Sequence, residues 1–151
     1  MRKARRWWLL LGVFGALALA LAPRPVQAQE FDLGVGADFW TEGSGAGLFT
    51  FALDALWRVA PDFQLGFKPG LLLTTASDAQ GGIPLDFKMR LGVGKVYVDG
   101  FAGPWFFFKG TAVRAHVGVG AGVRLGRLLL GGEVSYLSSG ATFGGRLAFQ
   151  L

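Results

Sequence analysis

The feature that most constrains this chain is a two-residue alternation of apolar and polar side chains, which recurs from Phe31 to Leu151. The stretch 113–124 is the clearest case, with Val or Ala at every odd position and Arg, His or Gly at every even position. A period of two predicts β-strands whose successive side chains point to opposite faces. The polar face is too charged for the core of a soluble protein, and the apolar face is too continuous to lie in water. The pattern therefore predicts a closed barrel in a membrane, apolar outside and polar inside.

The first 28 residues have the pattern of a cleavable signal peptide. Four basic residues among the first six precede an apolar run over 7–21, which is shorter than the ~20 residues of a typical spanning helix. The small-residue end Val26-Gln27-Ala28 predicts cleavage after Ala28. The chain is thus predicted to consist of a signal peptide, 1–28, and one barrel domain, 29–151. An uncleaved anchor, or twin-arginine export through Arg5-Arg6, is the alternative.

Removing the signal peptide changes the charge balance. The chain has 15 Lys and Arg against 10 Asp and Glu, and five of the basic residues but no acidic ones lie within 1–28. Residues 29–151 therefore carry 10 basic and 10 acidic groups, which gives no support for a nucleic-acid partner. The absence of cysteine excludes disulfides and thiolate metal sites.

The alternation divides the domain into eight strands, so we expect an all-β, eight-stranded antiparallel up-and-down transmembrane β-barrel. Pro69 falls inside the third strand and predicts a bulge there. The fifth strand is the least regular, and Asp99 sets its phase. Ten or eleven residues at ~3.3 Å each, tilted by ~40°, rise about 25 Å, which matches the apolar band of an outer membrane. The predicted strands are 31–40, 47–59, 63–73, 83–93, 96–106, 113–124, 128–137 and 141–151.

The connections between the predicted strands and the aromatic residues near the strand ends also fit a transmembrane barrel. Polar, Gly-rich loops at 41–45, 74–82, 109–110 and 138–140 alternate with tight turns at 60–62, 94–95 and 126. With both termini in the periplasm, the loops face outside. Aromatic residues near the strand ends predict two girdles at the membrane interfaces. One girdle contains Phe39, Phe49, Phe106, Phe108, Tyr136 and Phe143, and the other contains Phe31, Trp57, Phe63 and Phe149.

This pattern resembles the small eight-stranded outer-membrane barrels of the OmpA transmembrane domain and OmpX type, over the whole of 29–151. The resemblance implies the outer membrane of a diderm bacterium and a monomer surrounded by outer-membrane lipids. The last strand, Arg146-Leu-Ala-Phe-Gln-Leu151, is similar to the signal that such proteins present to the barrel-assembly machinery. That signal usually ends in Phe or Trp, whereas here Leu151 follows Phe149 by two residues. The long surface-binding loops of the family are missing, so adhesion is not expected.

The inward charges are the candidate functional residues, and we expect them to form an interior ion-pair network. Eight strands leave room inside for side chains only, and an unpaired charge there is costly. Seven basic and six acidic groups plus one histidine nearly balance, which favours a filled barrel with a structural role over a narrow channel for ions or small solutes. The predicted network is Asp54, Arg58, Lys68, Asp86, Lys88, Arg90, Asp99, Arg114, His116, Arg124, Glu133 and Arg146, together with Asp32 and Asp38.

His116 is the one histidine, and it raises the alternative of a lipid-modifying enzyme. A catalytic triad needs a serine and an acid beside it, and outer-membrane lipid A deacylases carry a His-x-Ser pair on one strand. The sequence His116-Val117-Gly118 lacks that serine, so a hydrogen-bonded interior histidine is favoured. No catalytic residue, cofactor or metal site is predicted.

Two further expectations concern the interior. The alternating inner glycines, Gly118, Gly120 and Gly122, lack the spacing of a phosphate loop, and they predict space for long Arg and Lys side chains. A soluble ligand-binding barrel of lipocalin type is the remaining alternative. It requires the reverse phase, with an apolar interior and a polar exterior.

Overall fold

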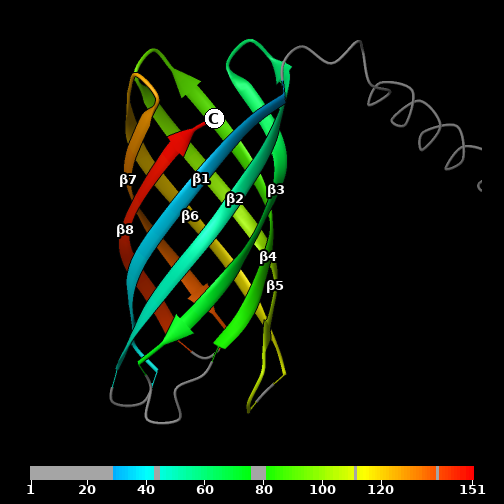
Figure 1. The fold of residues 1–151 in the computed structure, drawn as a ribbon, viewed down its shortest axis with the longest axis vertical. Helices are drawn as coiled ribbons and strands as arrows, with labels where there is room; N and C mark the ends of the chain where they lie inside the picture. Colours follow the sequence, from blue (N-terminus) through cyan, green and yellow to red (C-terminus); the bar gives the residue numbers. More distant parts are fainter. Residues whose placement is uncertain (1–28, 43–44, 76–80, 111, 139) are drawn as a thin grey trace, which may run out of the picture.

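Eight β-strands wind around a single lumen in the computed structural model, which describes residues 29–42, 45–75, 81–110, 112–138 and 140–151 (Figure 1). The predicted signal peptide, with its cleavage site at Ala28, lies outside the described residues, as do 43–44, 76–80 and 139 of the predicted loops. Across the described ranges, no helix is long and apolar enough to cross a membrane. The strands are β1 (Gln29–Trp40), β2 (Ala46–Ala60), β3 (Phe63–Thr74), β4 (Gly81–Val93), β5 (Val96–Phe107), β6 (Val113–Leu125), β7 (Leu128–Leu137) and β8 (Gly140–Gln150).

Every strand is antiparallel to its neighbours in sequence, and β1 pairs with β8 to close the barrel. The closing seam is continuous from Asp32, opposite Gln150, to Trp40, opposite Thr142. Closure leaves no strand edge with unpaired backbone groups. The predicted eight-stranded antiparallel barrel is confirmed, and each predicted strand end lies within two residues of the observed one.

The phase of the strands also agrees with the prediction. In β5, Tyr97, Asp99, Phe101 and Trp105 are buried, and Val98 points outward with half of its surface exposed. The least regular strand in the sequence therefore keeps the alternation that Asp99 indicated.

The predicted bulge at Pro69 is wrong. Ala52 pairs with Gly70, and Ala55 pairs with Phe67 in the same register, so the ladder only skips the two positions between them. Proline has no N–H to donate, and skipping pairs accommodates it without an inserted residue. The irregularity in this strand pair lies instead between Arg58 and Ala60, beside the turn into β3.

The two ends of the barrel differ. At one end, here called the turn end, two-residue turns join β2 to β3, β4 to β5 and β6 to β7. Gly94 and Gly126 begin two of these turns with φ of 63° and 65°, which a residue with a Cβ rarely adopts. The opposite end, the loop end, carries the longer connections (Figure 1).

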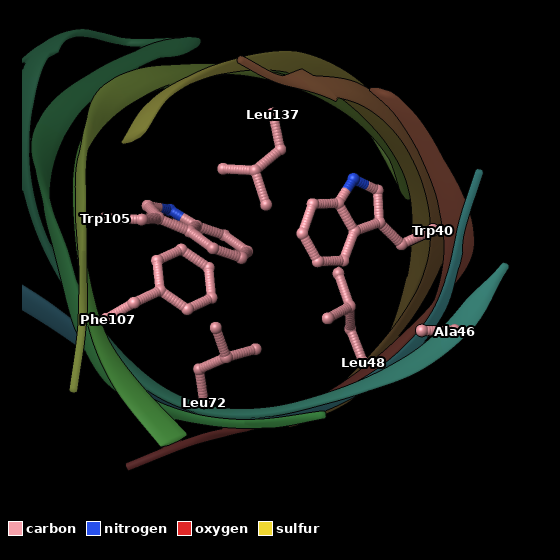
Figure 2. Close-up of a cluster of buried hydrophobic side chains, with 7 residues drawn as sticks. All are labelled: Trp40, Ala46, Leu48, Leu72, Trp105, Phe107 and Leu137. Atoms are coloured by element: carbon pink, nitrogen blue, oxygen red, sulfur yellow. The ribbon is translucent and has the colours of Figure 1, made fainter. Parts of the chain in front are cut away.

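An apolar plug fills the lumen at the loop end. Its side chains come from five strands and point inward from the ribbon that encircles them (Figure 2). Leu48 and Leu137 have no exposed surface, and the rings of Trp40 and Phe107 stack with their centroids 6.4 Å apart. The plug consists of Trp40, Ala46, Leu48, Leu72, Trp105, Phe107 and Leu137.

Candidate functional site

The centre of the lumen is a closed group of five charged side chains from four strands. Arg90 of β4 donates to Asp32 of β1 (Nη1 to Oδ2, 2.6 Å) and to Asp99 of β5 (Nε to Oδ1, 2.8 Å). Lys88 lies one inward position along the same strand, with its Nζ 2.5 Å from Asp54 and 2.8 Å from Asp99. All five side chains are buried, so solvent screens these attractions little.

A second buried group lies toward the loop end. The Arg146 guanidinium contacts Glu133 with two nitrogens, donates to Thr50 and lies 3.0 Å from an oxygen of Asp38. The ammonium of Lys68 lies 3.5 Å from Glu133 and 4.9 Å from the centre of a phenylalanine ring. Glu133 on β7 thus pairs with Arg146 of the adjacent strand β8 and with Lys68 of β3 on the opposite side of the barrel.

Charged pairs also occur near the two ends. At the turn end, Arg58 donates to Glu30 (Nη2 to Oε1, 2.7 Å), and Arg124 lies 3.6 Å from the other oxygen of that carboxylate. At the loop end, Arg114 donates to Glu42 (2.6 Å). The Arg114 guanidinium also lies over the ring of Trp40, which couples this pair to the apolar plug.

His116 is the centre of a buried hydrogen-bonded chain whose members come from the five consecutive strands β4 to β8. Its Nδ1 lies 2.9 Å from Asp86 and its Nε2 lies 2.8 Å from Ser135, which is hydrogen-bonded in turn to Thr142. Trp105 Nε1 donates to both carboxylate oxygens of Asp86 at 3.2 Å. With the neutral imidazole, Nδ1–H donates to the carboxylate and Nε2 accepts from the Ser135 hydroxyl.

This connectivity is that of a Ser-His-Asp triad, which the sequence reasoning had disfavoured because no serine lies two residues after the histidine. The serine comes instead from β7, opposite the neighbouring Gly118. Two aromatic rings flank the imidazole: the ring of Trp105 lies 4.1 Å from it and that of Phe101 lies 5.2 Å away, centre to centre. His116 and Ser135 are 3% and 5% exposed. Hydrogen bonds from an imidazole to a serine and a carboxylate occur both in a catalytic triad and in a buried structural chain.

A small cavity of about 40 Å³ lies between the two central charged groups. It is lined by Lys68, Lys88, Arg90, Glu133 and Arg146, among others, and His116 and Ser135 do not line it. This volume exceeds the ~10–15 Å³ that one water needs, and its polar walls offer the required partners. The lumen therefore has room for water near its centre, and the apolar plug lies between this cavity and the loop end.

Each charge of the predicted network lies inside the barrel or at its ends with an oppositely charged or hydrogen-bonding partner. Sequence reasoning missed Glu30, which lies one residue before the predicted start of β1. With Glu30 the six predicted acids become seven, equal to the seven bases. It also missed Glu42, the partner of Arg114, and the apolar plug.

The inner glycines make room for neighbouring side chains. A Cβ on Gly36 would overlap the guanidinium of Arg146. On β6, however, a Cβ on Gly118 would overlap Ser135 and the ring of Phe101, and a Cβ on Gly122 would overlap the backbone carbonyl of Leu130 and the phenol of Tyr97. The β6 glycines therefore make room for aromatic rings and for the neighbouring strand, and not for long basic side chains.

The outer surface is apolar along every strand. Phe51, Leu71 and Val119 have between half and two thirds of their surface exposed at the middle of the barrel wall. The ten aromatic residues predicted as girdles all point outward, and they lie toward the two ends of the strands. A lipocalin-type barrel requires the opposite arrangement. In the described part of the chain, no group of three or more His, Cys, Asp or Glu residues could hold a metal ion.

Comparison with known proteins supports the fold. No family model and no curated protein matches the chain. A solved structure from the de novo design of transmembrane β-barrels is similar with a TM-score of 0.68 and 14% identity, covering 83% of this chain and 98% of that one. The solution NMR structure of the de novo designed TMB2.3 is similar with a TM-score of 0.52 and 16% identity, covering 82% and 94%. The chain has a transmembrane-type β-barrel fold.

Proposed function

We propose that residues 29–151 form an integral outer-membrane barrel with a structural role in the cell envelope and a lumen closed to solutes. The observation that carries this proposal is the combination of an apolar outer surface with a lumen filled by paired charges and an apolar plug. Any open path would have to pass both Arg90, which is paired with three carboxylates, and Arg146, which is paired with two.

The cell location and partners belong to the same proposal. An apolar wall with aromatic rings at both ends fits a bilayer, and closed barrels of this kind occur in outer membranes. The lipids of that membrane would surround a monomer, and the last strand, β8, would be the contact for the barrel-assembly machinery. No nucleic acid, cofactor or catalytic function is part of the proposal.

The test is to refold residues 29–151 in detergent, compare heated and unheated samples on a gel, and then record from planar bilayers. We expect a heat-dependent change in mobility, as for a closed barrel, and no conductance steps above the leak of the bilayer. Purification of the same chain as a soluble monomer without detergent would contradict the membrane assignment.

The second candidate is a narrow channel, and the water-sized cavity among charged groups favours it. Regular conductance steps from the wild-type barrel would support this candidate against the closed lumen. A double variant of the plug, Leu48→Ala with Leu137→Ala, is the matched comparison: conductance gained only in this variant would show that the plug is the barrier.

The third candidate is a lipid-modifying enzyme, and the hydrogen-bonded Asp86, His116 and Ser135 favour it. It predicts that His116→Ala and Ser135→Ala each abolish a change in lipid composition that the wild-type barrel produces. If the lipids are the same with wild-type protein and with either variant, while all three fold, the enzyme candidate fails.

A further inference from the structure

The turn end of the lumen opens into a basic hollow of about 150 Å³. Its charged lining comes from three strands and two turns: Arg58 from β2, Asp62 and Lys95 from the turns, Arg90 from β4 and Arg124 from β6. About a third of the side-chain surface of Arg58 and Arg124 is exposed, so these guanidinium groups reach solvent through the hollow.

The positive charges in this hollow are incompletely compensated. Arg90 is held by Asp32 and Asp99 below, but Arg58 and Arg124 share the single carboxylate of Glu30. The Arg58 contact is a hydrogen bond of 2.7 Å, whereas the Arg124 contact, at 3.6 Å, is too long for one.

Lys95 adds another positive charge at the mouth, and it makes no ion pair within the described ranges. The rim carries one net positive charge, because it has three basic residues, Arg58, Arg124 and Lys95, and two acidic ones, Glu30 and Asp62. Arg127 in the next turn is not included in this count. A guanidinium on strand β6 and an ammonium in the turn between β4 and β5, both lining one small hollow, suit a compact oxyanion with several acceptor oxygens.

We propose that this hollow is a phosphate-binding site, in which Arg124 and Lys95 bind the phosphate oxygens and Arg58, held by Glu30, lines the floor. The site goes beyond the proposed structural role and depends only on the barrel fold. The phosphate could belong to a free anion or to the headgroup of a lipid in the leaflet beside the turn end, because the recognition chemistry is the same.

The experiment uses residues 29–151 refolded in an uncharged maltoside detergent, with folding verified by the heat-dependent gel shift. Inorganic phosphate is titrated at constant ionic strength against chloride, and the midpoint temperature of unfolding is measured. A second arm adds short-chain phosphatidic acid in place of phosphate. Arg124→Gln and Lys95→Gln are the test variants. Arg127→Gln is the matched control, because it removes the same charge from the turn end without lining the hollow.

We expect a saturable rise of the midpoint, with an apparent affinity that falls about tenfold in each test variant, as for loss of one charge-assisted hydrogen bond. The control is expected to keep the wild-type affinity. A response to phosphatidic acid alone would support the site with the headgroup as its source. A non-saturable rise, or an equal loss in the control, would overturn the site in favour of general charge screening. No response in either arm from correctly folded protein would also overturn it, without affecting the proposed structural role.

Discussion

Replacing Arg90 by methionine tests whether the central ion pairs stabilise the barrel. The guanidinium is 2% exposed and lies within 2.6 to 3.1 Å of oxygens of Asp32 and Asp99. In the Arg90→Met variant, Asp99 keeps its contact with Lys88 at 2.8 Å. Asp32, which is 1% exposed, loses its cation and has no second ion pair among the described residues.

The expected cost follows from this geometry. Removing one partner of a buried pair costs about 3–5 kcal/mol, because it leaves a charge buried without compensation. Arg58→Met is the matched control, since it removes the same group from a pair whose arginine side chain is 38% exposed. Glu30 is buried, but in this variant it keeps Arg124 at 3.6 Å. A pair with a solvent-exposed partner contributes about 0–1 kcal/mol, so the two variants should differ by several kcal/mol.

A third variant separates the buried charge from the lost packing. Adding Asp32→Asn to Arg90→Met removes the stranded carboxylate, and we expect it to recover about 0.5–3 kcal/mol of the loss. If the loss came from missing side-chain volume alone, the added Asn would recover nothing.

The assay is urea unfolding in detergent or lipid vesicles, followed by the fluorescence of the lumen tryptophans Trp40 and Trp105. If the free energy of unfolding has the same slope against urea concentration in all variants, all of them expose the same amount of surface on unfolding. Losses of the same size in Arg90→Met and Arg58→Met, or a loss under about 1 kcal/mol in Arg90→Met, would refute the reasoning. The lumen would then be wet enough to screen its charges.

Two further predictions concern the wall of the barrel. In lipid vesicles, Phe51→Arg at mid-wall should destabilise the protein by about 2–4 kcal/mol, and Phe149→Arg near the turn end by about 0–1 kcal/mol. Urea titration measures both losses, and equal losses would contradict a bilayer around this wall. In the same titration Gly103→Ala should cost about 1–3 kcal/mol, because its Cβ would overlap the backbone carbonyl of Leu85. The control Gly92→Ala should leave the stability unchanged, because a Cβ there would have no atom within 4 Å. An unchanged stability in Gly103→Ala would show that β5 can shift freely.

The sequence predicts which face of the barrel wall each residue of the candidate site points to, but it does not predict which residues contact one another. Ser135 has the parity of Glu133, and Thr142 has the parity of Arg146, so the alternation places both on the inner face. Nothing local in the sequence indicates that they meet His116. Glu30 has the same parity as Asp32 and Asp38, so the alternation contained the signal for it, and only the predicted start of β1 excluded it. The plug residues Leu48, Leu72 and Leu137 were missed because an apolar residue on the polar face looks like an irregularity in a sequence.

The sequence by itself determined the strands, their phase and the apolar exterior, because a period of two is a local property of each strand. It also determined that the inner charges nearly balance. Only the tertiary structure decided which charges meet, since Arg90 reaches Asp32 across 58 positions of the chain. Such partners depend on the register of every strand pair around the closed ring, which no single stretch of sequence contains. The same dependence places the apolar plug at one end of the lumen and the basic hollow at the other.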